Sequence, residues 1–143
     1  MMRAIPVATA LAATVVAAVV CAGCRSAPAS ADSKPVKVIW RQVASFSGRG
    51  SSQTQSFSVE SGAIRVRWRT SNESPKGAGD FKMTLNSAVS GRVLQPLADS
   101  NGTGQDTAYV SIDPHWSYLV IDSKNVDWSA VVEEPVTVSP GER

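Results

Sequence analysis

Three arginines, Arg65, Arg67 and Arg69, stand at every second position in a segment whose intervening residues are apolar. A β-strand places alternate residues on one face, so the guanidinium groups would form a row about 7 Å apart, with the apolar side chains facing a core. A guanidinium group binds a carboxylate or phosphate through two parallel N–H donors. The row therefore predicts a surface for an anionic ligand. The alternative is a solvated face on which acidic residues, such as Glu60 or Glu133, pair with the arginines across strands.

Trp116 is the second candidate for ligand binding. It follows a turn sequence at 113–115, and an aromatic ring exposed beside a turn can stack on a sugar or a peptide. The other three tryptophans, Trp40, Trp68 and Trp128, fall on positions that we expect to face the core.

The only histidine, His115, gives little support to catalysis. A serine triad needs a histidine near a nucleophile and an acid, and no serine stands in a Gly-x-Ser-x-Gly elbow. A zinc site needs three or four ligands. We therefore expect no enzyme, no catalytic residue and no cofactor, with a hydrolase as the remote alternative.

The segment 99–106 is the best metal candidate. Asp99, Asn101 and Asp106 supply side-chain oxygens around two glycines, and calcium binds several oxygens in a sharply turned loop. However, the bidentate glutamate of such loops is absent, and Asn101-Gly102 forms a common hairpin turn by itself. We therefore predict no metal site and keep calcium as the alternative for this loop.

The N-terminal region has the three parts of a secretory signal. Arg3 gives a short basic start, residues 4–20 carry no charge, and the small residues Ala22 and Gly23 precede Cys24. A retained membrane anchor is the alternative, but about 17 to 21 apolar residues lie at the lower limit for spanning a bilayer.

The sequence Ala22-Gly23-Cys24 resembles the cleavage box of bacterial lipoproteins. In that family the cysteine thiol receives a diacylglycerol, and a peptidase cuts directly before it. Cys21 departs from the pattern, because leucine or valine is usual there. The resemblance implies lipidation of Cys24, and two acyl chains attach a protein stably to a membrane. We therefore expect a protein held by a lipid anchor on the extracytoplasmic face of the cell membrane.

Cysteine and charge counts agree with this interpretation. The chain has two cysteines; cleavage would remove Cys21 and lipidation would consume Cys24, so the mature domain would contain no disulfide. Removing Arg3 lowers Lys+Arg from 14 to 13, against 12 Asp+Glu. A net charge of +1 argues against a nucleic-acid partner, which requires a strongly basic surface.

Four regions follow from the composition. Residues 1–23 are the predicted signal peptide, and residues 24–35, rich in serine, alanine and proline, form a predicted flexible tether. Residues 36–134 are the predicted folded domain, and residues 135–143 are a predicted disordered tail.

Alternation of apolar and polar residues in the folded domain predicts short strands separated by turns rich in glycine, serine and asparagine. The predicted strands lie near 36–46, 57–59, 64–69, 81–85, 92–97, 107–112, 118–122 and 127–133. Seven or eight such strands indicate an all-β fold, an antiparallel β-sandwich similar to a jelly roll.

Several segments resemble a small β-sandwich module of secreted bacterial proteins, near the CUB-like and pre-peptidase C-terminal-like sandwiches. The resemblance rests on Phe46-Ser-Gly-Arg-Gly, Thr54-Gln-Ser-Phe-Ser-Val, Ile64-Arg-Val-Arg-Trp, Phe81-Lys-Met-Thr-Leu, Tyr118-Leu-Val-Ile-Asp and Trp128-Ser-Ala-Val-Val. It covers nearly the whole domain and implies a surface binding or accessory role.

Two hypotheses of function remain. The first is a non-catalytic module that binds an anionic envelope polymer, a lipid headgroup or a partner protein through the arginine row. The second is a structural or accessory subunit that stabilises another envelope protein through a sheet face or an edge strand.

Overall fold

The computed structural model describes residues 35–139, which form nine β-strands in two antiparallel sheets. The predicted all-β antiparallel sandwich is therefore confirmed. The strands are β1 (Lys37–Arg49), β2 (Ser52–Gln53), β3 (Phe57–Val59), β4 (Ala63–Ser71), β5 (Asp80–Ser87), β6 (Val93–Asn101), β7 (Gly104–Ser111), β8 (His115–Lys124) and β9 (Asp127–Val138). The predicted signal peptide, Cys24 and the tether up to residue 34 lie outside the described residues. No helix within residues 35–139 is long and apolar enough to cross a membrane.

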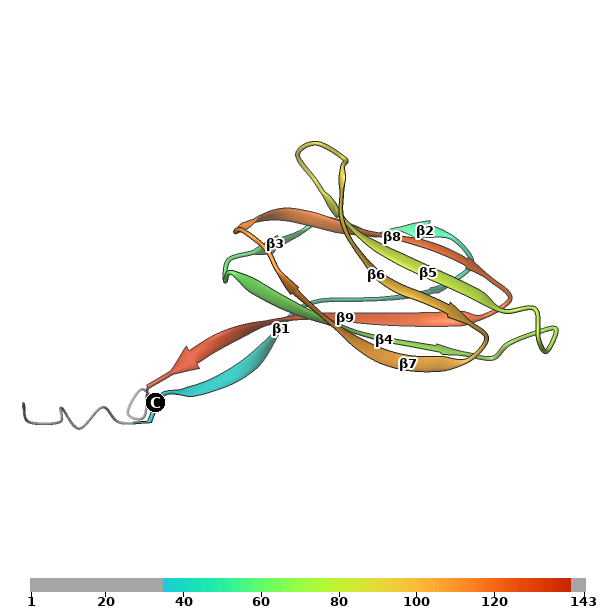
Figure 1. The fold of residues 1–143 in the computed structure, drawn as a ribbon, viewed down its shortest axis with the longest axis horizontal. Coiled ribbons are helices and arrows are strands. Elements are labelled where there is room, and N and C mark those ends of the chain that lie inside the picture. Colours follow the sequence, from blue (N-terminus) through green and yellow to red (C-terminus); the bar gives the residue numbers. More distant parts are fainter. Residues whose placement is uncertain (1–34, 140–143) are drawn as a thin grey trace, which may run out of the picture. The chain divides into compact units, whose positions relative to one another are not determined.

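The two sheets face each other across the core (Figure 1). Sheet A has the strand order β1-β9-β4-β7. Sheet B has the order β2-β8-β5-β6, and the short β3 also pairs with β8. All the pairs are antiparallel. As a result β1 and β7 are the edges of sheet A, while β4 and β9 are its inner strands.

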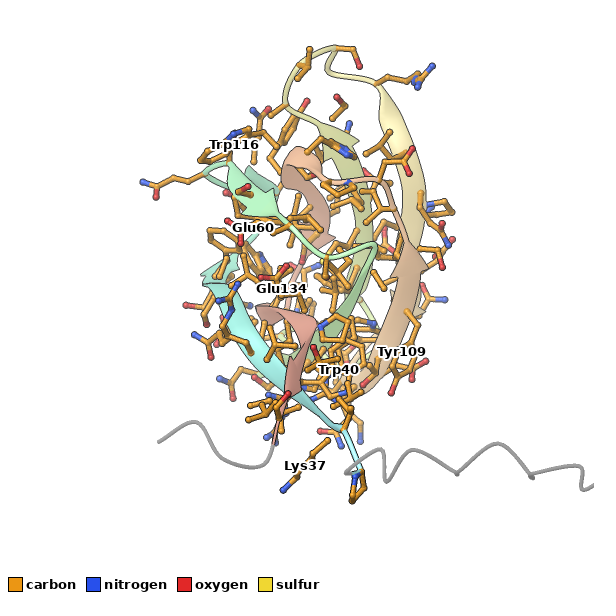
Figure 2. The ribbon with its side chains drawn as sticks, turned by 90° about the vertical axis from the view of Figure 1, so that its left-hand side faces the viewer. Lys37, Trp40, Glu60, Tyr109, Trp116 and Glu134 are labelled. Carbon is orange, nitrogen blue, oxygen red and sulfur yellow. The ribbon has the colours of Figure 1, made fainter. Side chains whose placement is uncertain are left out.

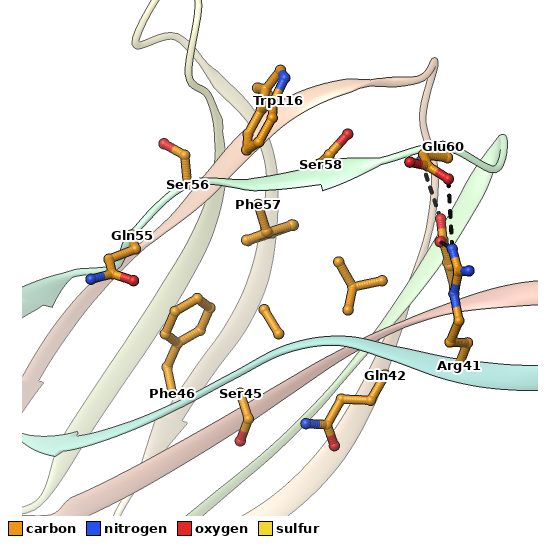
Figure 3. A pocket seen from close by; sticks show the side chains of 13 residues that line it. Arg41, Gln42, Ser45, Phe46, Gln55, Ser56, Phe57, Ser58, Glu60 and Trp116 are labelled. Atoms are coloured by element: carbon orange, nitrogen blue, oxygen red, sulfur yellow. Dashed lines mark hydrogen bonds and ion pairs between the residues drawn. The ribbon is translucent and has the colours of Figure 1, made fainter.

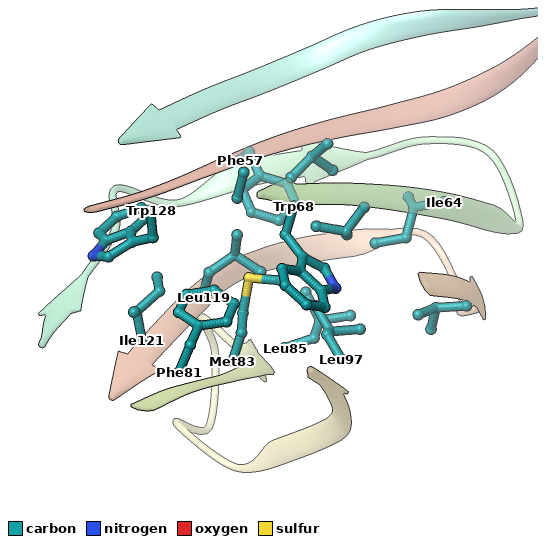
Figure 4. Packing of buried hydrophobic residues seen from close by; sticks show 14 of the residues in the cluster. Phe57, Ile64, Trp68, Phe81, Met83, Leu85, Leu97, Leu119, Ile121 and Trp128 are labelled. Atoms are coloured by element: carbon teal, nitrogen blue, oxygen red, sulfur yellow. The ribbon is translucent and has the colours of Figure 1, made fainter. Parts of the chain in front are cut away.

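Alternate side chains of both sheets meet between them and form the core (Figure 4). Strand β4 turns its apolar residues inward and its arginines outward, as the sequence predicted. Strand β5 buries Phe81, Met83 and Leu85 in the same way. The rings of Trp68 and Phe81, from opposite sheets, pack with centroids 5.2 Å apart. The remaining buried apolar residues are Phe57, Val59, Ile64, Val66, Leu97, Val110, Leu119, Ile121, Val126, Trp128, Ala130 and Val132.

A β-bulge between Gln42 and Ala44 reverses the face on which the side chains of β1 lie. A bulge inserts one extra residue into a strand. Even positions before this bulge therefore point outward, whereas Ala44 and later even positions point toward the core. Trp40 consequently lies on the outer face of sheet A, and the prediction that it faces the core is wrong. Trp68 and Trp128 are buried, as predicted.

Strand β9 extends beyond the predicted end of the domain. A disordered tail is predicted at 135–143, but β9 continues to Val138 and pairs with the start of β1, from Pro135 opposite Trp40 to Val138 opposite Lys37. The boundary at residue 134 is therefore corrected. Proline is tolerated in a strand where its missing N–H is not needed by a neighbour, and β4 does not pair with β9 beyond Glu133.

One glycine near the end of β1 makes room for Trp128, and a second one accepts a hydrogen bond from it. A Cβ atom on Gly48 would lie 2.9 Å from Cζ2 of the Trp128 ring, which is too close for a normal contact. Gly50 has a φ of +79°, a conformation that other residues rarely adopt. The indole N–H of Trp128 donates a hydrogen bond of 2.9 Å to the carbonyl oxygen of Gly50. The glycine pair thus has a structural role.

Candidate functional site

The outer face of sheet A carries all three predicted arginines. They lie on β4, between β9 and β7, and alternate with residues that point into the core. Their neighbours across the strands are Tyr109 and Glu133 for Arg65, Thr107 and Val131 for Arg67, and Gln105 and Ser129 for Arg69.

Glu133 on β9 pairs with two arginines of the row. Arg67 donates from Nε and Nη2 to the two carboxylate oxygens of Glu133, both at 3.1 Å. Arg65 also donates from Nε to Glu133. The hydrogen bond from Arg65 is the largest influence on this carboxyl, and with the nearby positive charges it holds the pKa of Glu133 below its usual value despite partial burial. Cross-strand pairing with Glu133 is therefore confirmed, and it neutralises one of the three positive charges.

An aromatic pair lies beside the first arginine. The guanidinium carbon of Arg65 lies 4.5 Å from the centroid of the Trp40 ring, within cation–π range. The Trp40 ring meets Tyr109 edge to face, with centroids 6.0 Å apart. Tyr109 is largely exposed. Arg65 is thus held by a carboxylate and an aromatic ring, and little of its guanidinium is left for a ligand.

Arg69 lies at the other end of the row, in a shallow hollow of about 470 Å³. Among the described residues it has no ion pair. Asp106 also lines this hollow, but it lies opposite Trp68 in the register, so its side chain leaves β7 on the face opposite to that of Arg69. Its Oδ1 accepts a hydrogen bond of 2.7 Å from the backbone N–H of Thr107. The hollow is lined by Arg67, Trp68, Arg69, Gln105, Asp106, Thr107, Ser129 and Val131. It therefore offers an unpaired cation among groups that can hydrogen-bond a hydroxyl or carbonyl.

Trp116 does not belong to this face. It lies on β8 of sheet B, 56% exposed, at the rim of a separate groove of about 590 Å³ between β1 and β3. Figure 3 shows Trp116 and Phe57 on opposite sides of β3. In Figure 2, Trp116 lies far from Trp40 and Tyr109. Trp116 and the arginine row, the two separate candidates for ligand binding, therefore lie on different sheets.

His115 and the predicted calcium-loop residues do not lie in the hollow around Arg69 as a group. His115 lines a third hollow, near Arg92. Asp99 and Asn101 lie on β6, and Asp106 lies on β7. Within residues 35–139, no group of three or more histidine, cysteine, aspartate or glutamate side chains could hold a metal ion.

One cluster of charged residues was missed by the sequence analysis. Glu134 points inward at the end of the sandwich, and its side chain is only 2% exposed. Its carboxylate accepts hydrogen bonds from the Arg41 guanidinium and from the backbone N–H groups of Glu60 and Ser61, at 3.1 and 3.2 Å. Glu60 itself approaches Arg41 at 3.6 Å (Figure 3). The available signal was the pair Glu133-Glu134, because adjacent strand residues point to opposite faces.

No protein-family model matches this chain, and no curated protein is significantly similar to it.

Proposed function

We propose that this chain is a non-catalytic binding module, anchored by lipid to the outside of a bacterial cell membrane, that binds an anionic envelope polymer. The observation that carries the proposal is Arg69, an exposed cation without an ion pair among the described residues, in a hollow beside Arg67. The two residues are about 7 Å apart on one strand face. Because Arg67 is paired with Glu133, Arg69 is the main cation that this face offers to a charged group of a polymer.

The lining of the hollow favours a particular kind of ligand. Gln105, Thr107 and Ser129 supply neutral donors and acceptors, which suit hydroxyl and carbonyl groups. A polysaccharide that carries carboxylate or phosphate groups supplies both the hydroxyl groups for these residues and an anion for Arg69.

Arg69→Gln is expected to weaken the binding of polygalacturonate by roughly three- to tenfold, because one charge-assisted contact is lost. Titration calorimetry of the full chain at low salt measures the change, with neutral dextran as the comparison polymer. The matched control is Arg92→Gln, which removes the same charge from an exposed site preceding β6. Equal losses in the two variants, or equal binding of dextran, would show that Arg69 is not part of a specific site.

The lipid anchor has a separate test. Cys24→Ser is expected to release the protein from membranes, because the thiol that carries the diacylglycerol is absent. Membrane fractionation and intact-mass measurement of the wild-type and variant proteins check this result. A wild-type mass without the diacylglycerol increment would refute the anchor.

The second hypothesis, an accessory subunit that adds a strand to β1, has weaker support. Strand β1 is an edge strand of 13 residues, and edge strands can pair with other chains. However, it carries a bulge and the charged residues Lys37, Arg41 and Arg49. Bulges and charges are the features by which proteins prevent edge pairing. The sheet face is therefore the better candidate surface.

A further inference from the structure

The start of β1 and the end of β9 form a two-stranded ribbon that extends beyond the rest of the sandwich (Figure 1). Lys37 pairs with Val138, and Trp40 pairs with Pro135. Strand β4 pairs with β9 only as far as Glu133. The ribbon beyond that point therefore has no neighbour in sheet A except its own two strands.

Exposed apolar side chains gather at this ribbon. Val36, Val38 and Ile39 lie within four consecutive positions, and each is between 40% and 58% exposed. Val38 and Ile39 point to opposite faces of the ribbon. Apolar side chains are therefore exposed on both faces of the ribbon end. We call these three residues the apolar tip. Gathered exposed apolar residues are typical of a site that contacts a protein partner, a ligand or a membrane.

The groups next to the apolar tip are those that favour a membrane interface. Lys37 is exposed within it, and a lysine can keep its ammonium group among headgroups while its stem lies on apolar surface. Trp40 and Tyr109 lie next, farther from the ribbon end (Figure 2). Tryptophan and tyrosine are enriched where a membrane meets water. Apolar, cationic and aromatic groups thus follow one another along the ribbon.

The covalent chain places the apolar tip close to the proposed anchor. Val36 follows Cys24 by 12 positions. A linker of this length spans at most about 43 Å when extended and about 20 Å on average when flexible. Short tethers give effective concentrations in the millimolar range, so a weak affinity for the bilayer is sufficient.

We propose that the apolar tip inserts into the interfacial region of the membrane that carries the lipid anchor, and that it orients the domain on that surface. This inference rests on the proposed anchor at Cys24. The occupant is the bilayer itself, with anionic headgroups that attract Lys37.

A single-cysteine labelling experiment tests the proposal. In the mature lipidated protein the Cys24 sulfur would be blocked and Cys21 would have been cleaved off, so an introduced cysteine would be the only free thiol. Val38→Cys places an environment-sensitive fluorophore in the apolar tip. Val89→Cys, an exposed position in the β5–β6 connection, is the matched control. Both proteins are reconstituted into vesicles of phosphatidylcholine and phosphatidylglycerol.

The fluorophore at position 38 is expected to shift to the blue and to be quenched several-fold more strongly by lipid-borne quenchers than the fluorophore at position 89. The addition of Ile39→Asp to the Val38→Cys protein is expected to reduce that quenching. Equal quenching at positions 38 and 89 on vesicle-bound protein would overturn the proposal while the anchor stands. A blue shift at position 38 without lipid quenching would mean that a second protein copy covers the tip, and would also overturn it. Failure of both proteins to remain with the vesicles would instead refute the anchor.

Discussion

Replacement of Glu134 by alanine is expected to lower the free energy of unfolding by about 3 kcal/mol. The buried carboxylate accepts hydrogen bonds from Arg41 and from the backbone N–H groups of Glu60 and Ser61. A hydrogen bond to a charged acceptor contributes about 1.5 to 3 kcal/mol, and alanine cannot replace either backbone contact. Urea denaturation followed by tryptophan fluorescence measures the loss.

The matched control for this prediction is Glu60→Ala. The Glu60 side chain is exposed and reaches Arg41 only at 3.6 Å, so its removal should change the stability by less than about 0.5 kcal/mol. Glu60 and Ser61 lie in the turn between β3 and β4, and Glu134 binds their backbone N–H groups. Equal stability of the two alanine variants would show that these hydrogen bonds do not stabilise the turn.

The carboxylate of Glu134 should also make the stability of the domain depend on pH. Burial is the largest single influence on the pKa of Glu134, and it raises that pKa. The hydrogen bonds from Arg41 and from the two backbone N–H groups together outweigh burial, so the pKa lies below its ordinary value of 4.5. The unfolded chain therefore binds the proton first as the pH falls. The contribution of Glu134 is complete above the ordinary value of 4.5 and is lost as the pH falls through the lower, folded-state pKa. The stability difference between wild type and Glu134→Gln should accordingly shrink below about pH 4.5.

The part of the fold that could be predicted from the sequence is the part where alternation is uninterrupted. On β4 and β5 the apolar residues recur at every second position, and both strands turn them inward as expected. On β1 the same periodicity continues through the sequence, but the bulge before Ala44 shifts the register. Because a bulge depends on pairing with the neighbouring strand, no property of β1 alone could indicate that Trp40 faces outward.

For the candidate site, the sequence predicts which residues share a face but not which of them are paired. That the arginines share a face follows from the strand period, and pairing with Glu133 was one of two stated alternatives. Which arginine stays unpaired depends on the strand order β9-β4-β7, which places Glu133 opposite Arg65 and leaves Ser129 opposite Arg69. Trp116 is a separate candidate, predicted from the turn that precedes it. Its place on β8 of sheet B, on another sheet than the arginine row, follows from strand pairing and not from the local sequence.

Replacement of Phe81 by alanine is expected to cost about 3 to 5 kcal/mol of unfolding free energy, the largest effect of any single change considered for this domain. The Phe81 side chain is completely buried and packs against Trp68 from the opposite sheet, with ring centroids 5.2 Å apart. Removal of the ring deletes buried apolar surface and leaves a cavity that the two sheets cannot fill by small shifts. Since domains of this size are stable by about 5 to 15 kcal/mol, a substantial part of the total is lost.

Lys82→Ala provides a control on the same strand, because the adjacent side chain points outward and is exposed. Its expected effect is within about 0.5 kcal/mol. Phe81→Leu keeps most of the volume and should cost less than about 1.5 kcal/mol, so it remains measurable even if the alanine variant does not fold. Urea denaturation of the three variants at one temperature measures their free energies of unfolding. We expect Phe81→Ala to be the least stable, Phe81→Leu to be intermediate and Lys82→Ala to be the most stable. A loss at Lys82 as large as that at Phe81 would mean that the inner and outer faces of β5 have been assigned the wrong way round.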